Sequence, residues 1–295
     1  MKIKTRRYYI YYASKILFFA ISLIPRKISL VIADFLGRKA FSLLPKYRDI
    51  TISNLNEAFG GDHEKNLRMA RDVFRGLAKS GADWIKLMSL GKKGALRLVS
   101  ECQGLEYLDK TLGNERGAIL LASHFGNWEL LSAYLSTRGY KGAIIVRRLY
   151  FYKYDNFIVR LRRKFGVQVV YRDESPKKLL KVLKKGEMLG ILADQDVDST
   201  SGVFVNFFGK SAYTPTAPVK FAMAARVDIV PAFMIRKPDD SYKLVVEKPI
   251  TLLPEKDKAE SVRKYTQLWT DILEKYVRQY PEQWVWLHRR WKTEK

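Results

Sequence analysis

Cysteine is nearly absent from this chain of 295 residues, which carries a single one, Cys102. One cysteine cannot form an intrachain disulfide or a cysteine-based zinc site, and such scarcity is typical of a protein that lives in or faces a reducing compartment. Histidine is almost as rare, with three in the sequence. No internal repeat or low-complexity linker divides the chain, so we expect one main folded unit with a sizeable core.

Acidic residues are also scarce. The sequence has 30 aspartates and glutamates against 54 lysines and arginines, which gives a formal net charge of +24. So large a surplus predicts an anionic partner: a membrane, a phosphorylated substrate or a nucleic acid. The aromatic content of 13% favours a membrane surface, where amphipathic rings and basic side chains lie together. Aromatic rings also stack on single-stranded nucleic acid, but no RRM, helix-turn-helix or OB pattern is present, so we expect no nucleic-acid partner.

The first 26 residues predict a membrane-attached helix. The stretch YYIYYASKILFFAISLI, from Tyr8 to Ile24, is apolar apart from two serines and Lys15, and basic residues flank it on both sides. As a helix it would be about 25 Å long, slightly short of a bilayer core. No small-residue cleavage site follows, so we do not interpret it as a signal peptide. The alternative is a buried first helix of a soluble fold. It is less favoured, because tyrosines beside basic residues are typical of a membrane interface.

The rest of the chain, residues 27–295, predicts an α/β fold. From 27 to about 115, apolar residues recur at three- and four-residue spacing without a strand-like run, which indicates a helical layer. From about 116 onward, short apolar runs typical of strands buried on both faces alternate with helical segments. This alternation predicts a mostly parallel sheet flanked by helices. The predicted strands are 117–122, 142–146, 167–171, 187–193 and 227–235.

The stretch LLASHFGNWELL interrupts an apolar run with polar residues. It places His124 at the carboxyl end of a predicted strand, where open α/β sheets form ligand crevices, and it opens a helix with Asn127 as N-cap. Glu129 can then contact one imidazole nitrogen and leave the other free to take a proton. We therefore predict that His124 and Glu129 are catalytic, with a core histidine as the alternative. A Ser123 nucleophile is less favoured, since no G-x-S-x-G elbow surrounds it.

With SHFGNWE, the sequence resembles the late acyltransferases of lipid A biosynthesis, the lauroyl and myristoyl transferases, which are H-x-x-x-x-[D/E] acyltransferases. The resemblance covers nearly the whole chain through five blocks in the family's order: YRDITISNLNEAF, SHFGNWE, ADQDV, GVFVNFFGKSAYTPTAPVKFAMA and PEQWVWLHRRWK. One region departs. Many members read R-P-x-x-N-P after the strand that ends at Val146, whereas this chain reads RRLYFYKYDN, so that only Arg147 matches.

The resemblance implies a glycerolipid acyltransferase-like fold and an enzyme on the cytoplasmic side of the inner membrane. It would move a fatty acyl group from acyl carrier protein to a hydroxyl of a phosphorylated glycolipid, a lipid A precursor, with His124 as general base and Glu129 orienting it. Because a thioester is already activated, neither a cofactor nor a covalent intermediate is needed. The alternatives are acylation of another glycolipid, such as a phosphoinositol mannoside, or of a lysophospholipid, and a non-catalytic basic protein that binds membrane or nucleic acid.

Further candidate residues lie in the other blocks. Arg147 follows a predicted strand and can clamp an acceptor phosphate or an oxyanion, with a solvated surface charge as the less favoured alternative. The aspartates of ADQDVDST do not fit the EF-hand template, so we expect no metal site there and a structural or substrate-positioning role for the first of them. The predicted substrate-binding residues are Arg147, Asn127, Asp194, Gln195, Arg289 and Arg290.

Aromatic and basic clusters complete the predictions. Phe204, Phe207, Phe208 and Tyr213 surround a turn and can line an acyl pocket, although core packing explains them equally well. Near the end of the chain, tryptophans beside basic residues predict anchoring at a membrane interface, namely Trp284, Trp286 and Trp291. A lysine-rich helix over 177–185 predicts a solvated face first, and second a dock for the acidic carrier protein or for lipid headgroups.

Overall fold

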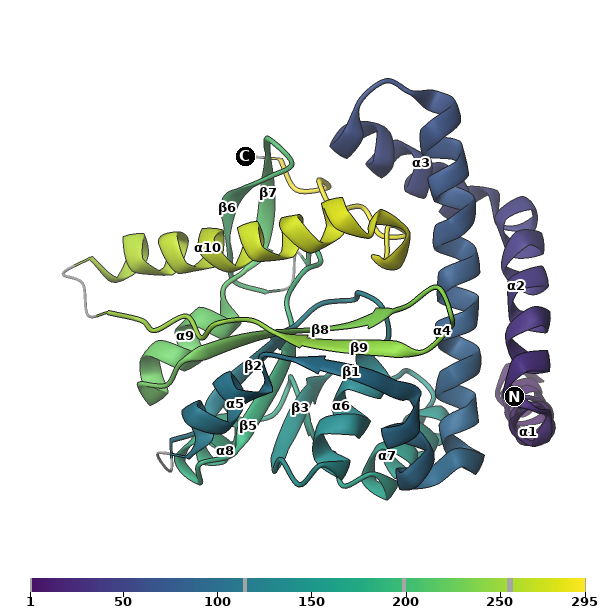
Figure 1. Cartoon of the computed structure of the whole chain (residues 1–295), viewed down its shortest axis with the longest axis horizontal. Coiled ribbons are helices and arrows are strands. Elements are labelled where there is room, and N and C mark those ends of the chain that lie inside the picture. The colour runs from purple at the N-terminus through teal and green to yellow at the C-terminus, as the bar shows by residue number, and fades with distance from the viewer. Residues whose placement is uncertain (1, 114–115, 198–199, 254–256, 295) are drawn as a thin grey trace.

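A computed structural model describes residues 2–113, 116–197, 200–253 and 257–294. Helices come first in the chain. Figure 1 shows them as a flank beside the sheet, with the long α4 between the sheet and the first two helices, which both pack against α4. The predicted helical N-terminal layer is therefore present. Its helices are α1 (Lys2–Leu23), α2 (Arg26–Leu43), α3 (Pro45–Phe59) and α4 (His63–Leu98).

The sheet has seven strands in the order β1-β9-β8-β2-β5-β3-β4. Its neighbouring strands run parallel except for β8 and β9, which confirms the predicted α/β class with a mostly parallel sheet. The strands are β1 (Val99–Gln103), β2 (Ala118–Ala122), β3 (Gly142–Val146), β4 (Gln168–Tyr171), β5 (Met188–Leu192), β8 (Ile229–Arg236) and β9 (Tyr242–Val246). β6 (Gly202–Phe207) and β7 (Lys210–Pro215) form a separate antiparallel hairpin.

Helices cover both faces of the sheet (Figure 1). Alternate residues of β2 serve the two faces, because Ile119 and Leu121 join one apolar cluster while Leu120 joins the other. This alternation is why a strand buried on both faces reads as one continuous apolar run. The covering elements are α5 (Leu105–Leu112), α6 (Trp128–Thr137), α7 (Tyr152–Lys164), α8 (Pro176–Lys184), α9 (Ala217–Ala225), α10 (Lys258–Gln279) and the 3₁₀ turn η1 (Pro281–Gln283).

The predicted strands match observed ones, but the prediction that residues before 115 are only helical is wrong. β1 lies in that region, at the edge of the sheet beside β9. Its residues are mostly exposed and read Val-Ser-Glu-Cys-Gln, so no alternation of apolar and polar residues marks them as a strand. The sequence analysis also missed β9, which pairs with β1 and β8, and the hairpin, in which β6 pairs with β7 across a turn.

The C-terminal tryptophans are part of the core. The side chains of Trp284 and Trp286 are fully buried, and their rings pack edge to face at 4.6 Å between centroids. The predicted role of these two residues as membrane anchors is therefore wrong. Their rings contact Phe207 and Phe208 of the hairpin, which favours core packing over an acyl pocket for those phenylalanines.

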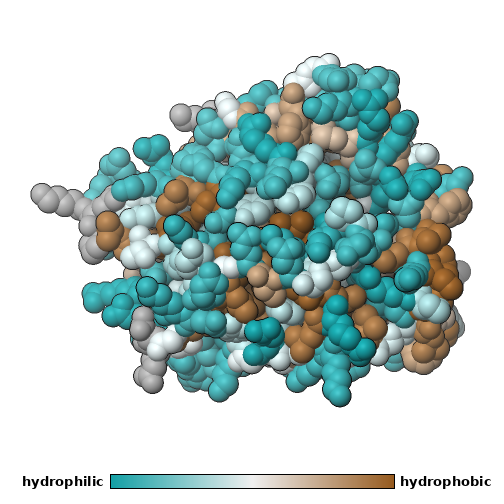
Figure 2. All heavy atoms as spheres, in the orientation of Figure 1, coloured by the Kyte–Doolittle hydropathy of each residue, from teal (hydrophilic) through white to brown (hydrophobic). Residues whose placement is uncertain are grey.

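α1 and α2 leave much apolar surface uncovered. Most of the exposed large apolar side chains in the described structure lie between residues 9 and 44, among them Ile16, Phe19 and Phe35. In Figure 2 hydrophobic atoms gather over this flank. Of the helices described, none has the length and hydrophobicity needed to cross a bilayer. Attachment of the first helix to a membrane stays a prediction.

Candidate active site

The turn between β2 and α6 carries the central motif, Ser123 to Asn127. Asn127 caps α6 as predicted, since its Oδ1 accepts a hydrogen bond from Leu130 N at 3.0 Å. Gly126 has φ 58°, and a Cβ there would lie 1.8 Å from the carbonyl oxygen of Met234 in β8. The glycine is therefore required by the close approach of β8.

His124 is paired with Asp194, the second residue after the end of β5. His124 Nδ1 lies 2.9 Å from Asp194 Oδ1, and the backbone N of His124 donates to Asp194 Oδ2 at 2.9 Å. The Asp194 side chain is fully buried, while a quarter of the His124 side chain is exposed. The aspartate therefore holds Nδ1 as the protonated nitrogen and leaves Nε2 to accept a proton.

The C-terminal segment completes this pair. Trp284 Nε1 donates to Asp194 Oδ2 at 2.8 Å, and Val285 N donates to the carbonyl oxygen of His124 at 3.0 Å. The block PEQWVWLHRRWK thus packs behind the turn that carries His124. Because Asp194 Oδ2 accepts from both His124 N and Trp284 Nε1, the direction in which the buried carboxylate faces His124 is fixed.

The electrostatics of the pair suit a base. Burial lowers the pKa of His124, but the charge of Asp194 and the hydrogen bond to it prevail and raise this pKa above its ordinary value. Burial would raise the pKa of Asp194, whereas His124 and Trp284 hold it well below its usual range. Asp194 is therefore ionised at neutral pH and stabilises the imidazolium that forms when Nε2 takes a proton.

Glu129 has a different partner from the one predicted. Its carboxylate accepts two hydrogen bonds from Arg162 in the last turn of α7, Nε to Oε2 at 3.0 Å and NH2 to Oε1 at 2.5 Å. The direct contact between Glu129 and His124 that the sequence suggested is thus replaced by contacts of each with another residue. Glu129 stays close enough to contribute to the raised pKa of His124. The sequence analysis missed Arg162, because nothing distinguishes it from the basic residues around it.

Arg147 lies where the sequence placed it, directly after β3 at the edge of the sheet that also carries His124. Its side chain is exposed and has no acidic partner among the described residues. Arg148 stacks over the Tyr171 ring at 3.6 Å and pairs with Asp173. Of these two arginines, Arg147 is the one available to an anionic group.

Several predicted substrate-binding residues are held inside the protein. Arg290 is fully buried and donates to the carbonyl oxygen of Tyr213 and to Thr214 Oγ1, so it belongs to the scaffold. Asn127 and Asp194 are also buried and act through the turn and through His124. Gln195 is partly buried and Arg289 is exposed, and neither has a hydrogen-bond partner in the described part of the chain.

The competing residues give no second catalytic centre. The Ser123 hydroxyl is buried and has no hydrogen-bond partner among described residues, so no base activates it. Asp196 accepts from Thr293 N and Oγ1 and fastens the C-terminal segment. Asp198 lies outside the described residues. Within the described ranges, no three His, Cys, Asp or Glu side chains are grouped as metal ligands would be.

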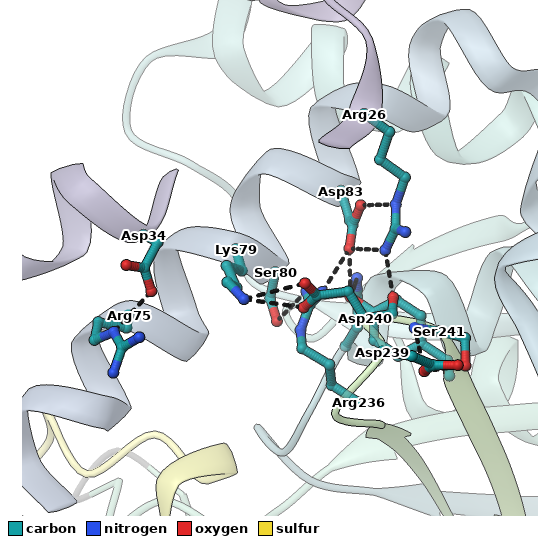
Figure 3. A network of polar contacts seen from close by, with 12 residues as sticks. Arg26, Asp34, Arg75, Lys79, Ser80, Asp83, Arg236, Asp239, Asp240 and Ser241 are labelled. Carbon is teal, nitrogen blue, oxygen red and sulfur yellow. Dashed lines mark hydrogen bonds and ion pairs between the residues drawn. The ribbon is translucent and has the colours of Figure 1, made fainter. Parts of the chain in front are cut away.

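Figure 3 shows a network of polar contacts that includes Arg26, Asp83 and Arg236. At its centre is Asp83 of α4, which is fully buried. It accepts hydrogen bonds from Arg26 Nε and NH2 at 2.7 and 2.9 Å and from Tyr242 OH at 2.7 Å, and it pairs with Arg236 at 3.0 Å. The Tyr242 hydroxyl in turn accepts from Asn127 Nδ2 at 3.1 Å. The network therefore links the corner between α1 and α2 to the cap of α6.

The fold and the site together are those of an α/β enzyme with a paired histidine at the carboxyl edge of its sheet, in the H-x-x-x-x-E spacing of acyltransferases. The family model for bacterial lipid A biosynthesis acyltransferase matches residues 1–293. The chain therefore belongs to the bacterial lipid A biosynthesis acyltransferase family, as the resemblance predicted.

Curated relatives agree with this assignment. The lipid A biosynthesis lauroyltransferase of Escherichia coli K12 is 27% identical over 269 residues, which is 88% of this chain and 83% of that protein. The myristoyltransferase of the same organism is 24% identical over 277 residues, 93% of this chain and 84% of that protein. A phosphatidylinositol mannoside acyltransferase of Mycobacterium tuberculosis is 26% identical over 144 residues, 48% of this chain and 45% of that protein.

Proposed function

We propose that this acyltransferase moves a fatty acyl group from the thioester of an acyl carrier protein to a hydroxyl of a phosphorylated glycolipid, a lipid A precursor. The observation that carries the proposal is the His124–Asp194 pair at the carboxyl edge of the sheet. Membership in the lipid A biosynthesis acyltransferase family supports the substrate class. The net charge of +24 suits an anionic acceptor.

The reaction needs one proton carrier. Nε2 of His124 takes the proton of the acceptor hydroxyl as its oxygen attacks the thioester carbonyl, and Asp194 stabilises the resulting imidazolium. The tetrahedral intermediate then collapses, the carbon–sulfur bond breaks, and the proton on Nε2 passes to the leaving thiolate. An ester and a free thiol result, and no covalent intermediate with the enzyme is formed.

Arg162 and Glu129 support the same centre. Nε and NH2 of Arg162 are engaged with Glu129, which leaves NH1 as a fixed cationic donor beside the catalytic turn. A guanidinium held in this way can stabilise the oxyanion of the intermediate without reorganising during the reaction. Arg147, exposed at the same edge of the sheet, is our candidate for the contact with the acceptor phosphate.

The acceptor is a lipid, so the enzyme must work at a membrane surface. The apolar flank of α1 and α2 supports attachment there, and we place the enzyme on the cytoplasmic face of the inner membrane, where acyl carrier protein is available. The mannoside acyltransferase among the relatives, whose match covers about half of this chain, makes a phosphoinositol mannoside the second candidate acceptor.

The test is acyl transfer by the purified protein from acyl-loaded carrier protein to a phosphorylated lipid A precursor, followed by mass spectrometry of the lipid. Wild type should add one acyl chain, and His124→Ala should abolish transfer while keeping the fold, because only the proton carrier is lost. A phosphoinositol mannoside assayed in parallel distinguishes the two acceptors. Wild-type rates from His124→Ala would contradict the mechanism, and acylation of neither acceptor would contradict the function.

A further inference from the structure

A basic groove runs along the edge of the sheet formed by β4. It has a volume of about 630 Å³ and is lined by Arg163 at the end of α7, by residues 166–170 and by one side of α8. Its charged lining consists of Arg163, Lys178, Lys181 and Lys185 with a single acid, Glu187. The following paragraphs refer to it as the β4 groove.

The positive charge of the groove is not needed by the fold. α8 buries Leu179, Val182 and Leu183 against the sheet, and its lysines all point outward. Lys178 pairs with Glu174, but Lys181, Lys185 and Arg163 have no acidic partner among the described residues. Clustered like charges repel one another, so this cluster is unfavourable until an anionic partner covers it.

The groove is next to the active site. Arg163 follows Arg162, which holds Glu129. β4 is separated from β2 by β5 and β3, roughly 14 Å at the usual strand spacing. α8 starts at the edge of the sheet where the parallel strands end, so the Lys178 end of the groove opens on the same edge as His124. A flexible arm that leaves this end reaches the crevice without crossing the protein.

The surroundings of the groove favour a protein over a lipid. Among the described residues that line the groove, no large apolar side chain is exposed, and such side chains strengthen binding to a membrane surface by inserting into it. Most of the exposed large apolar side chains lie instead over α1 and α2, on the flank that Figure 1 shows far from α8, and three more, Leu149, Tyr150 and Tyr152, lie just before or at the start of α7. The acceptor and the donor can therefore approach from different sides of the molecule.

We propose that the β4 groove is the docking surface for the carrier protein, an acidic protein that lays a negatively charged helix against α8 and the end of α7. The inference rests on the proposed function, because it takes the donor to be an acyl carrier protein thioester. Complementary charge would steer the encounter and set the orientation of the carrier, while the arm that bears the thioester passes from the Lys178 end to His124.

The experiment compares two donors that share a thioester but differ in size: acyl carrier protein and acyl-pantetheine, which lacks the carrier. The variant is Lys181→Glu with Lys185→Glu. At low salt its KM for the acyl carrier protein should rise by roughly tenfold or more with kcat unchanged, and its KM for acyl-pantetheine should stay at the wild-type value. High salt should raise the wild-type KM for the carrier protein and so reduce the difference in this KM between wild type and the variant.

The matched control is Lys258→Glu with Arg263→Glu on α10, which makes the same change in net charge outside the groove. It should leave KM for both donors near wild type. The docking surface would be overturned if the groove variant kept the wild-type KM for the carrier protein. It would also be overturned if the KM for acyl-pantetheine rose as much as the KM for the carrier, or if the control variant showed the same rise in carrier KM. Weaker binding to anionic vesicles with carrier KM unchanged would assign the groove to lipid headgroups and overturn it as well. A wild-type enzyme that uses neither donor would instead contradict the proposed function.

Discussion

The two ion pairs at the turn between β2 and α6 are built in different ways. His124 and Asp194 follow β2 and β5, neighbouring parallel strands in which Ala122 lies beside Leu192, so the register of the sheet sets their distance. Glu129 and Arg162 come from the two helices α6 and α7, whose packing can adjust. Asp194 is fully buried, whereas Glu129 and Arg162 keep 17% and 16% of their side chains exposed.

The difference has an energetic meaning. Removing one partner of a buried pair leaves a charge without compensation, at a cost of about 3–5 kcal/mol. Asp194 has no exposed surface and would bear this cost in full, whereas Glu129 keeps 17% of its side chain exposed and can be partly hydrated. The rigid pair therefore suits the group that must transfer a proton in a fixed geometry. The more adaptable pair holds a cation that needs only to lie near the oxyanion.

The largest effect is expected for Asp194→Asn. The asparagine removes the charge that stabilises the imidazolium and no longer specifies Nδ1 as the protonated nitrogen, so kcat should fall about 10³-fold or more. The measurement is single-turnover acyl transfer, with circular dichroism to show that the fold is kept. A rate within tenfold of wild type would show that Asp194 does not orient the base.

The same pair predicts a pH dependence. The base must be neutral to act, so kcat/KM should fall as the pH drops through the pKa of His124, which Asp194 raises above its ordinary value. In Asp194→Asn this pKa falls, so the acid limb of the remaining activity should move to lower pH. A pH profile of kcat/KM for wild type and Asp194→Asn checks this. If the acid limb lies at the same pH in both proteins, a group other than His124 causes it.

Arg162→Met tests the adaptable pair and should have a smaller effect. Glu129 loses its partner but keeps some exposed surface, so kcat should fall about 10–100-fold while the free energy of unfolding decreases by less than the roughly 3–5 kcal/mol of a fully buried pair. Arg162→Lys should recover part of the activity. Arg160→Met, an exposed arginine on the same helix, is the control and should resemble wild type. Equal losses in both Met variants would point to the charge of α7 in general.

Tyr242→Phe should have the smallest effect on the chemistry. It removes the hydroxyl that joins Asp83 to Asn127, leaving both ion pairs intact. The free energy of unfolding should decrease by about 1–3 kcal/mol, the cost of leaving buried polar groups unpaired, and kcat should change by less than about tenfold. Chemical denaturation and the transfer assay measure the two effects. A loss of kcat as large as that of Asp194→Asn would make this network part of the catalytic machinery.

Local patterns predicted the elements that carry the site. The apolar run before His124 and the N-cap Asn127 marked the end of β2 and the start of α6, and the lysine-rich pattern over 177–185 marked α8. β1 could not be predicted in this way, because an exposed edge strand needs no apolar alternation. β1 gave no signal in the sequence, whereas Trp284 gave a signal with two meanings. A tryptophan beside basic residues suits both a membrane interface and a core, and the sequence analysis chose the wrong one.

The amino-acid sequence by itself determined the fold class, the position of His124 at the end of a strand and the family, because each depends on residues close together in the chain. Only the tertiary structure decided which carboxylate serves His124. Asp194 is 70 residues away along the chain and reaches the histidine because β5 pairs with β2, while Glu129, five residues away, is drawn to Arg162 by the packing of α7. Proximity in sequence favours a contact, but sheet register and helix packing decide it.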